Sequence, residues 1–184
     1  MLVIPRVNPE DSVPVTIDFS LTDEVAVMLG MFEEAGVEAV VALPDGKALE
    51  GWSEVLEADL ALADVVTSDY AGVMLPDTQG KDVINDRTVE IVREALDLGM
   101  PVAAQQRSVY TLAVAGALEG RQYACEKPIP TWIIEDEGGG TYSGTAVIQD
   151  GNVITSGTGP WKAIERDRPD GTTELTRLFI NALG

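Results

Sequence analysis

The chain has 184 residues, 45% of them hydrophobic, which is enough for one domain with a substantial core. It carries 31 acidic and 12 basic residues, a net charge of -19, so phosphate backbones are repelled and nucleic acid is not an expected partner. A single cysteine and the absence of histidine exclude an internal disulfide and the usual zinc sites, and we expect neither a metal nor a cofactor.

The same composition bears on where the protein works. No apolar run reaches the roughly 18 residues of a membrane-spanning helix, and the first residues lack the apolar core of a signal peptide. One cysteine fits a reducing compartment, so we expect a cytoplasmic protein without a membrane span. The acidity is typical of a solubilising surface, with salt adaptation as the alternative.

The first 120 residues alternate expected strands with expected helices. Residues 1–14 hold three prolines and are expected to be an irregular lead-in. Strands are expected at residues 15–19, 37–43, 71–75 and 102–104. Helices are expected after a cap at Ser20 or Thr22, ending at Gly36, and after a cap at Asn85 or Asp86, ending at Gly99. A third expected helix begins at Val109.

The remaining segments have different patterns. Residues 47–68 are weakly patterned, and Trp52, Val55 and Leu56 suit one helical turn. Thr145–Ile148 and Val153–Ser156 flank an Asp-Gly turn and predict a β-hairpin, and a last helix is expected from about Thr173. The order predicts one α/β domain over residues 1–184, with a mostly parallel sheet, helices on both faces and a C-terminal hairpin.

The stretch Pro101–Gly120 predicts the place of a functional site. An apolar strand turns abruptly polar at Gln105–Ser108 and continues as a helix from Val109. Such an elbow lies at the carboxyl edge of a parallel sheet, beside a helix N-terminus that favours negative charge. A nucleophile often occupies this position, but here it holds glutamine.

The segments GMPVAAQQRSVYTLAVAGALEGR and VIQDGNVITSG, together with the LPDT loop, resemble the ThiJ/PfpI superfamily from about Val15 to Leu183. The resemblance implies a flavodoxin-like fold of the class I glutamine amidotransferase type. Family members usually read Ala-Ala-Ile-Cys-His-Gly at the elbow. Their cysteine aligns with Gln106 and their histidine with Arg107, so thiolate chemistry such as deglycation or peptide hydrolysis is not expected here.

The resemblance also names the other candidate residues. The family's Leu-Pro-Gly-Gly loop, part of its oxyanion hole, aligns with Leu75-Pro76-Asp77-Thr78. The family acid that hydrogen-bonds the cysteine aligns with Glu24, and a downstream pocket position falls near Glu126. Glu24 is either a buried acid or base, or a first-turn acid that stabilises its helix.

The neighbouring residues keep alternatives open as well. Asp77 is either the partner carboxylate of Glu24 or a residue that turns the loop. Arg107 either clamps a substrate anion or pairs with Glu126, Asp77 or Glu24. Gln106 either hydrogen-bonds a ligand or fills the space of the missing thiol.

These residues lead to two main hypotheses. In the first, the protein is a small-molecule enzyme of the lyase, hydratase, isomerase or cyclase type. Glu24 is its catalytic base or acid, with Asp77 as its partner. Gln106, Arg107, Thr78 and Glu126 bind the substrate, and the backbone amides of Thr78 and Arg107 stabilise a developing oxyanion. In the second, it is a non-catalytic ligand-binding or structural protein, which a closed Gln106–Arg107–Glu126 network would favour. A stress chaperone is a third alternative. The resemblance implies a homodimer in each case.

Overall fold

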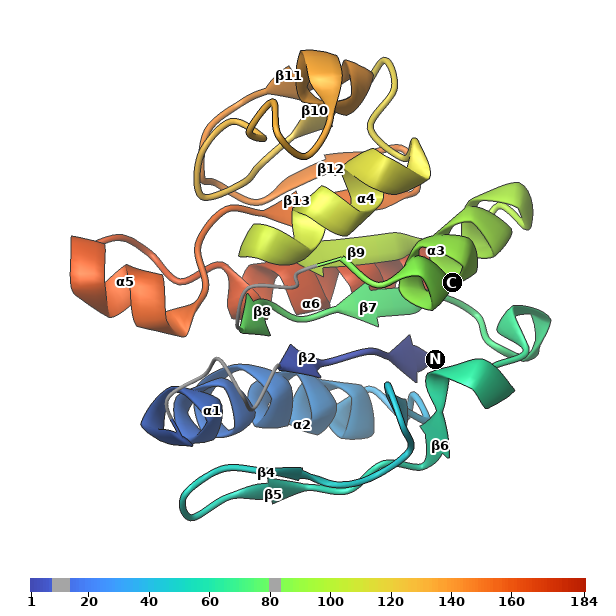
Figure 1. Cartoon of the computed structure of the whole chain (residues 1–184), viewed down its shortest axis with the longest axis vertical. Helices are drawn as coiled ribbons and strands as arrows, with labels where there is room; N and C mark the ends of the chain where they lie inside the picture. Colours follow the sequence, from blue (N-terminus) through green and yellow to red (C-terminus); the bar gives the residue numbers. More distant parts are fainter. Residues whose placement is uncertain (8–13, 80–83) are drawn as a thin grey trace.

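The computed structural model describes residues 1–7, 14–79 and 84–184 (Figure 1). Its centre is a seven-stranded sheet in the order β12-β13-β9-β7-β1-β3-β6. The strands are β1 (Leu2–Val3), β3 (Val40–Leu43), β6 (Leu60–Ala61), β7 (Val73–Leu75), β9 (Val102–Gln105), β12 (Ile148–Asp150) and β13 (Val153–Ser156). All neighbouring strands are parallel except β12 and β13, which form the hairpin. The predicted α/β class is therefore confirmed.

Helices cover both faces of this sheet. The helices are α1 (Pro14–Ser20), α2 (Ala26–Glu34), α3 (Asp86–Asp97), α4 (Val109–Ala115), α5 (Pro160–Arg166) and α6 (Thr172–Leu183). Helices α3 and α4 pack on one face, and α2 and α6 pack on the other. Alternate residues of β1 supply two cores, because successive side chains of a strand point to opposite faces. Leu2 packs in the cluster that includes residues of α3 and α4. Val3 packs with α2 and α6, where the rings of Phe32 and Phe179 meet edge to face at 6.2 Å.

The amino-terminal prediction was wrong in two places. Residues 2–3 form a strand in the middle of the sheet, paired with β3 and β7, and are not part of an irregular lead-in. Residues 14–20 form α1 and not the first strand. A proline is tolerated in the first turn of a helix, and β1 already fills the place between β3 and β7. Ile17 instead packs outside the sheet against Leu21 and Val41. Residues 8–13, also part of the expected lead-in, lie outside the described residues.

The segment 47–68 also differs from its prediction. It forms a short antiparallel pair, β4 (Leu49–Glu50) and β5 (Val55–Leu56), followed by β6 and two 3-10 turns, Leu62–Asp64 and Thr67–Asp69. Trp52 lies between β4 and β5 with 79% of its surface exposed, so no helical turn packs there. Two further short parallel pairs are β2 (Arg6–Val7) with β8 (Thr78–Gln79), and β10 (Gln122–Tyr123) with β11 (Thr141–Tyr142).

Other boundaries follow the predicted signals. The Asn85 side chain accepts a hydrogen bond from the Thr88 amide and caps α3, as expected. Gly36 and Gly99 end their helices with φ near +70°, a conformation that glycine adopts readily. Strand β12 begins at Ile148, three residues later than the expected Thr145. Helix α5 was not predicted, although Gly159-Pro160 is a helix-start signal.

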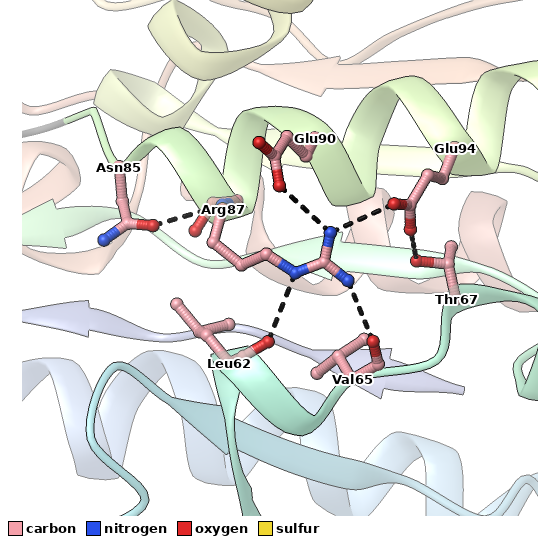
Figure 2. A network of polar contacts seen from close by, with 8 residues as sticks. Leu62, Val65, Thr67, Asn85, Arg87, Glu90 and Glu94 are labelled. Carbon is pink, nitrogen blue, oxygen red and sulfur yellow. Dashed lines mark hydrogen bonds and ion pairs between the residues drawn. The ribbon is translucent and has the colours of Figure 1, made fainter.

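Arg87 connects the segment of two 3-10 turns that follows β6 to helix α3. Figure 2 shows the Arg87 guanidinium of α3 between Glu90 and Glu94 on one side and two backbone carbonyls on the other. It donates to the Leu62 carbonyl at 3.4 Å and to the Val65 carbonyl at 2.8 Å. Glu94 also accepts a hydrogen bond from the hydroxyl of Thr67. The network holds residues 62–67, which directly follow β6, against helix α3.

Across the described ranges, none of the helices combines the length and apolar character needed to cross a membrane.

Candidate functional site at the strand–helix elbow

The elbow has the geometry that the sequence predicts. Strand β9 ends at Gln105, and the 3-10 turn Gln106–Ser108 leads directly into α4. Gln106 has a φ of +48°, which is uncommon for a residue with a β-carbon. Such strain is retained mainly where the surrounding structure requires it, often at functional sites. The hydroxyl of Ser108 donates to the carbonyl of Pro76 and ties the elbow to the neighbouring loop.

Glu24 reaches this elbow from a distorted helical turn. It lies in a π-helical turn, Leu21–Val25, inserted between α1 and α2, and is only 2% exposed. π-turns are frequent at functional sites because they redirect side chains. The predicted cap was wrong: Ser20 has helical φ and ψ, and the Thr22 hydroxyl donates to the Asp18 carbonyl. Glu24 is therefore a buried residue of a continuous helical segment and not a first-turn acid.

Asp77 lies between Glu24 and the elbow. Its backbone N–H donates to Oε1 of Glu24 at 2.7 Å. Its own carboxylate accepts from the backbone N–H of Arg107 at 3.0 Å and from Nε2 of Gln106 at 2.9 Å. These contacts bring together the two predicted catalytic carboxyls and two of the predicted binding residues. The backbone amide of Arg107 at the elbow is therefore occupied by the Asp77 carboxylate.

The two carboxyls have different surroundings. Burial raises the pKa of Glu24 well above its usual range, and the nearby charges of Asp77 and Asp170 raise it further. The hydrogen bond from the Asp77 N–H opposes this shift without overcoming it. The Asp77 carboxyl accepts one N–H donor on each of its two oxygens. The cluster therefore combines a buried acid of raised pKa with a carboxyl group held by two hydrogen bonds.

Glu126 pairs with residues outside this cluster. Oε1 of Glu126 lies 2.7 Å from Nη2 of Arg166 and 3.8 Å from Nζ of Lys162, both on α5. The Gln106–Arg107–Glu126 network considered above is therefore replaced by one that joins Gln106 and Arg107 to Asp77. The backbone of Thr78 belongs to β8 and pairs with Arg6 of β2.

Cys125 has an environment that disfavours nucleophilic chemistry. Its thiol is fully buried and donates to the carbonyl of Gln106 at 3.2 Å. Burial raises the pKa of this thiol to about 12, so the thiolate is not populated near neutral pH. The cysteine is therefore a small buried side chain that packs against the elbow and hydrogen-bonds its backbone.

Sequence reasoning missed three residues around the elbow. Nε2 of Gln105 donates to Oγ1 of Thr172 at 2.8 Å, while its Oε1 is buried without a hydrogen-bond partner among the described residues. The carboxylate of Asp170 accepts from the amide and the hydroxyl of Thr172. The Pro-Asp-Gly-Thr-Thr run before the last helix is a turn signal, but nothing in it indicates proximity to Glu24.

Within the described part of the chain, no group of three histidine, cysteine, aspartate or glutamate residues is placed to hold a metal ion. Glu24, Asp77 and Asp170 lie close enough to influence one another electrostatically, but they do not form such a group.

Comparison with known proteins identifies relatives over most of the chain. Residues 15–165 match the family model described as the DJ-1/PfpI family. An uncharacterized protein from Archaeoglobus fulgidus is 36% identical over 140 residues, covering 72% of this chain and 80% of the relative. A deglycase from Thermococcus kodakarensis is 27% identical over 139 residues, covering 72% of this chain and 81% of the relative.

Solved structures with the same fold have more distant sequences. A ThiJ/PfpI domain protein from Brachyspira murdochii has a TM-score of 0.75 at 18% identity, covering 99% of this chain and 94% of that protein. A putative protease I from Bacteroides thetaiotaomicron has a TM-score of 0.68 at 20% identity, covering 100% and 98%. At these identities the likeness concerns the fold alone.

Proposed function

Since the chain belongs to the DJ-1/PfpI family and holds Gln106 at the position of the family's cysteine, we propose that it acts on a small molecule by thiol-free acid–base chemistry. Glu24 is the proton donor of this reaction and Asp77 is the proton acceptor. The main support for the proposal is the hydrogen bond from the backbone N–H of Asp77 to the carboxyl of Glu24, which joins two buried acidic residues at the elbow.

Two carboxyl groups in one site separate into an acid and a base when their surroundings differ. The pKa of Glu24 is raised, first by burial, so this carboxyl keeps its proton to a higher pH than an exposed glutamate does. The Asp77 carboxylate, held by two N–H donors, is oriented at the elbow. Two neighbouring carboxyl groups that are buried together lose solvation and repel each other when both are charged, which favours a functional role for the pair.

The reaction class follows from these two groups. Asp77 accepts a proton from a carbon next to a carbonyl group, and Glu24 donates a proton to the carbonyl or leaving hydroxyl oxygen. The Gln106 amide and the Arg107 side chain, both at the elbow, orient the substrate. A lyase, hydratase, isomerase or cyclase reaction needs only these transfers, whereas a covalent acyl-enzyme needs a nucleophile. The Asp77 side chain must release the Arg107 amide before that amide can stabilise an oxyanion.

A second candidate function is ligand binding without turnover. It is favoured by the low exposure of the cluster, which is 2% for Glu24, 9% for Asp77 and 2% for Gln106. In this case Asp77 permanently occupies the elbow amide, and the acidic pair is a remnant of the family's site. The two candidates differ in whether a bound compound is consumed.

The test is a thermal-shift screen of carbonyl compounds and carboxylates, followed by NMR detection of ligand consumption. Wild type is compared with Glu24→Gln, Asp77→Asn and the control Glu33→Gln, whose residue lies exposed on α2. Ligands that bind the native state raise the unfolding midpoint. The proposal expects turnover that falls by about 100-fold or more in both site variants, the usual range for lost acid–base catalysis, and persists in Glu33→Gln.

Binding without consumption in wild type would favour the second candidate. Turnover that survives in both Glu24→Gln and Asp77→Asn would contradict the acid–base assignment directly.

A further inference from the structure

A cavity lies near the start of strand β9, at the opposite end of that strand from the elbow. It has a volume of about 360 Å³ and is lined by Arg93, Leu96, Asp97, Ala115, Gly116, Arg121 and Asn152. The carbonyl of Asn152 accepts from the amide of Val102, the first residue of β9, whereas the elbow follows the last residue of that strand. The cavity therefore belongs to a separate site, formed by the ends of α3 and α4 and the turn of the hairpin. Its volume is in the range that holds a small metabolite.

Two guanidinium groups line this cavity, and neither forms an ion pair with a carboxylate of the described residues. Nη2 of Arg93 donates to the carbonyl of Val114 at 2.9 Å, and Nη1 of Arg121 donates to the carbonyl of Ala117 at 2.8 Å. Among the described residues, each makes only this one side-chain hydrogen bond. An arginine has five N–H donors, so most donors of both groups remain available.

This arrangement is unusual on such an acidic chain. With 31 acidic residues against 12 basic ones, an exposed arginine has many potential carboxylate partners. Arg87, Arg166 and Arg177 do form ion pairs, with glutamates on α3, after β10 and on α6. Arg93 and Arg121 instead bond to carbonyls near the C-terminal end of α4, which fixes both guanidinium groups at the same cavity.

We propose that this cavity binds a small oxyanion, the phosphate or carboxylate group of a metabolite, between Arg93 and Arg121. A guanidinium that uses one terminal nitrogen for a carbonyl keeps another edge of its fork, and that edge matches an oxyanion with two parallel hydrogen bonds. Asn152 anchors the hairpin side of the cavity, because its Nδ2 donates to the Met100 carbonyl at 2.8 Å. Asp97 lines the same cavity and weakens the binding through its negative charge.

The site is tested by titrating the full chain with inorganic phosphate and, separately, with succinate, at constant ionic strength set with chloride. Isothermal calorimetry measures binding, and circular dichroism confirms that each variant is folded. The variants are Arg93→Gln, Arg121→Gln and Asp97→Asn. The control is Arg177→Gln, which removes an exposed arginine that pairs with Glu174 on α6. Constant ionic strength is essential because the chain carries a net charge of -19, and each addition of probe would otherwise change how strongly salt screens that charge.

The proposal expects saturable binding of at least one probe, weakened about tenfold or more in each cavity arginine variant and unchanged in Arg177→Gln. Asp97→Asn is expected to tighten binding by about threefold, since it removes a like charge from the cavity. A response to phosphate alone identifies a phosphate-bearing ligand, and a response to succinate alone identifies a carboxylate. Absence of saturable binding to both probes, or equal binding by all variants, would overturn the proposal.

Discussion

Glu24 is the residue whose environment most constrains the chemistry of the elbow. Its carboxyl is buried, faces the charges of Asp77 and Asp170, and accepts one backbone N–H. Since its pKa is raised in the folded state, the native protein binds more protons than the unfolded chain above about pH 4.5, the group's ordinary pKa. The free energy of unfolding therefore falls as the pH rises from the ordinary pKa of Glu24 through its raised pKa.

Replacing Glu24 with glutamine is expected to remove this pH dependence, because the amide keeps an acceptor for the Asp77 N–H and carries no charge. Between the ordinary pKa of Glu24 and its raised pKa in the folded protein, the free energy of unfolding of Glu24→Gln increases relative to wild type by up to about 1.4 kcal/mol per pH unit. Urea unfolding at a series of pH values from 4 upward measures the difference. The control Glu33→Gln, exposed on α2, should parallel wild type. A Glu24→Gln curve parallel to wild type would contradict the raised pKa.

Cys125 gives a second prediction at the scale of single residues. Its thiol is buried, its pKa is raised to about 12, and it donates to the Gln106 carbonyl. We expect iodoacetamide to leave the native protein unmodified at pH 8 and to alkylate it completely in concentrated urea, as measured by mass spectrometry. Rapid alkylation of the folded protein would show an accessible thiolate and would reopen thiol chemistry for this chain.

At the scale of elements, the elbow depends on close packing by the loop before α5. A β-carbon on Gly159 would lie 2.5 Å from Nε2 of Gln106 and 2.8 Å from Nε2 of Gln105. Both amides must then shift, and both make buried hydrogen bonds, to Asp77 and Thr172 respectively. Gly159→Ala is expected to destabilise the protein by about 1–3 kcal/mol.

Gly30 provides the matched control for that substitution. It lies inside α2, where an added β-carbon meets no atom within 4 Å. Gly30→Ala should therefore stabilise the protein by about 0.5–1 kcal/mol through higher helix propensity. Thermal unfolding of both variants measures the contrast. A Gly159→Ala variant as stable as Gly30→Ala would mean that the two glutamine amides are not fixed as described.

The elements that sequence reasoning identified are those with strong local signals. Strand β9 and the hairpin were recognised from apolar runs and turn residues, and α3 from its Asn85 cap. Residues 15–19 were mistaken for a strand because the β-branched Val15, Thr16 and Ile17 favour an extended conformation locally, but they lie in α1. Their helical form depends on β1 occupying the centre of the sheet, and the pairing of residues 2–3 with two distant strands has no local signature.

The residues of the candidate site were also predicted only in part. The resemblance aligned Glu24, Asp77, Gln106 and Arg107, and the structure brings all four into one hydrogen-bonded cluster. The partners of Glu126 could not be predicted, because α5 itself was missed. Asp170 is separated from Glu24 by most of the chain, and only the folded arrangement makes its charge relevant.

At the scale of the whole molecule, we propose a homodimer, as the family resemblance implies. Exposed apolar side chains on α5, Trp161 at 47% and Ile164 at 72% exposure, lie on a helix that also pairs with Glu126 beyond β10. Light scattering after size-exclusion chromatography at micromolar concentration is expected to give about twice the chain mass of 19.6 kDa. A mass near that of one chain would contradict the dimer and leave the elbow cluster to function within a single subunit.

The central claim is that the elbow holds a proton on Glu24 beside the carboxylate of Asp77. The most direct measurement is a carbon-13 NMR titration of the glutamate side-chain carboxyls in wild type and in Asp77→Asn. We expect one glutamate to titrate well above the others in wild type. Its signal is expected to be absent from Glu24→Gln and to titrate at lower pH in Asp77→Asn, because a neighbouring charge is removed. If the Glu24 carboxyl titrates together with the exposed glutamates, the acid–base account of this site is wrong.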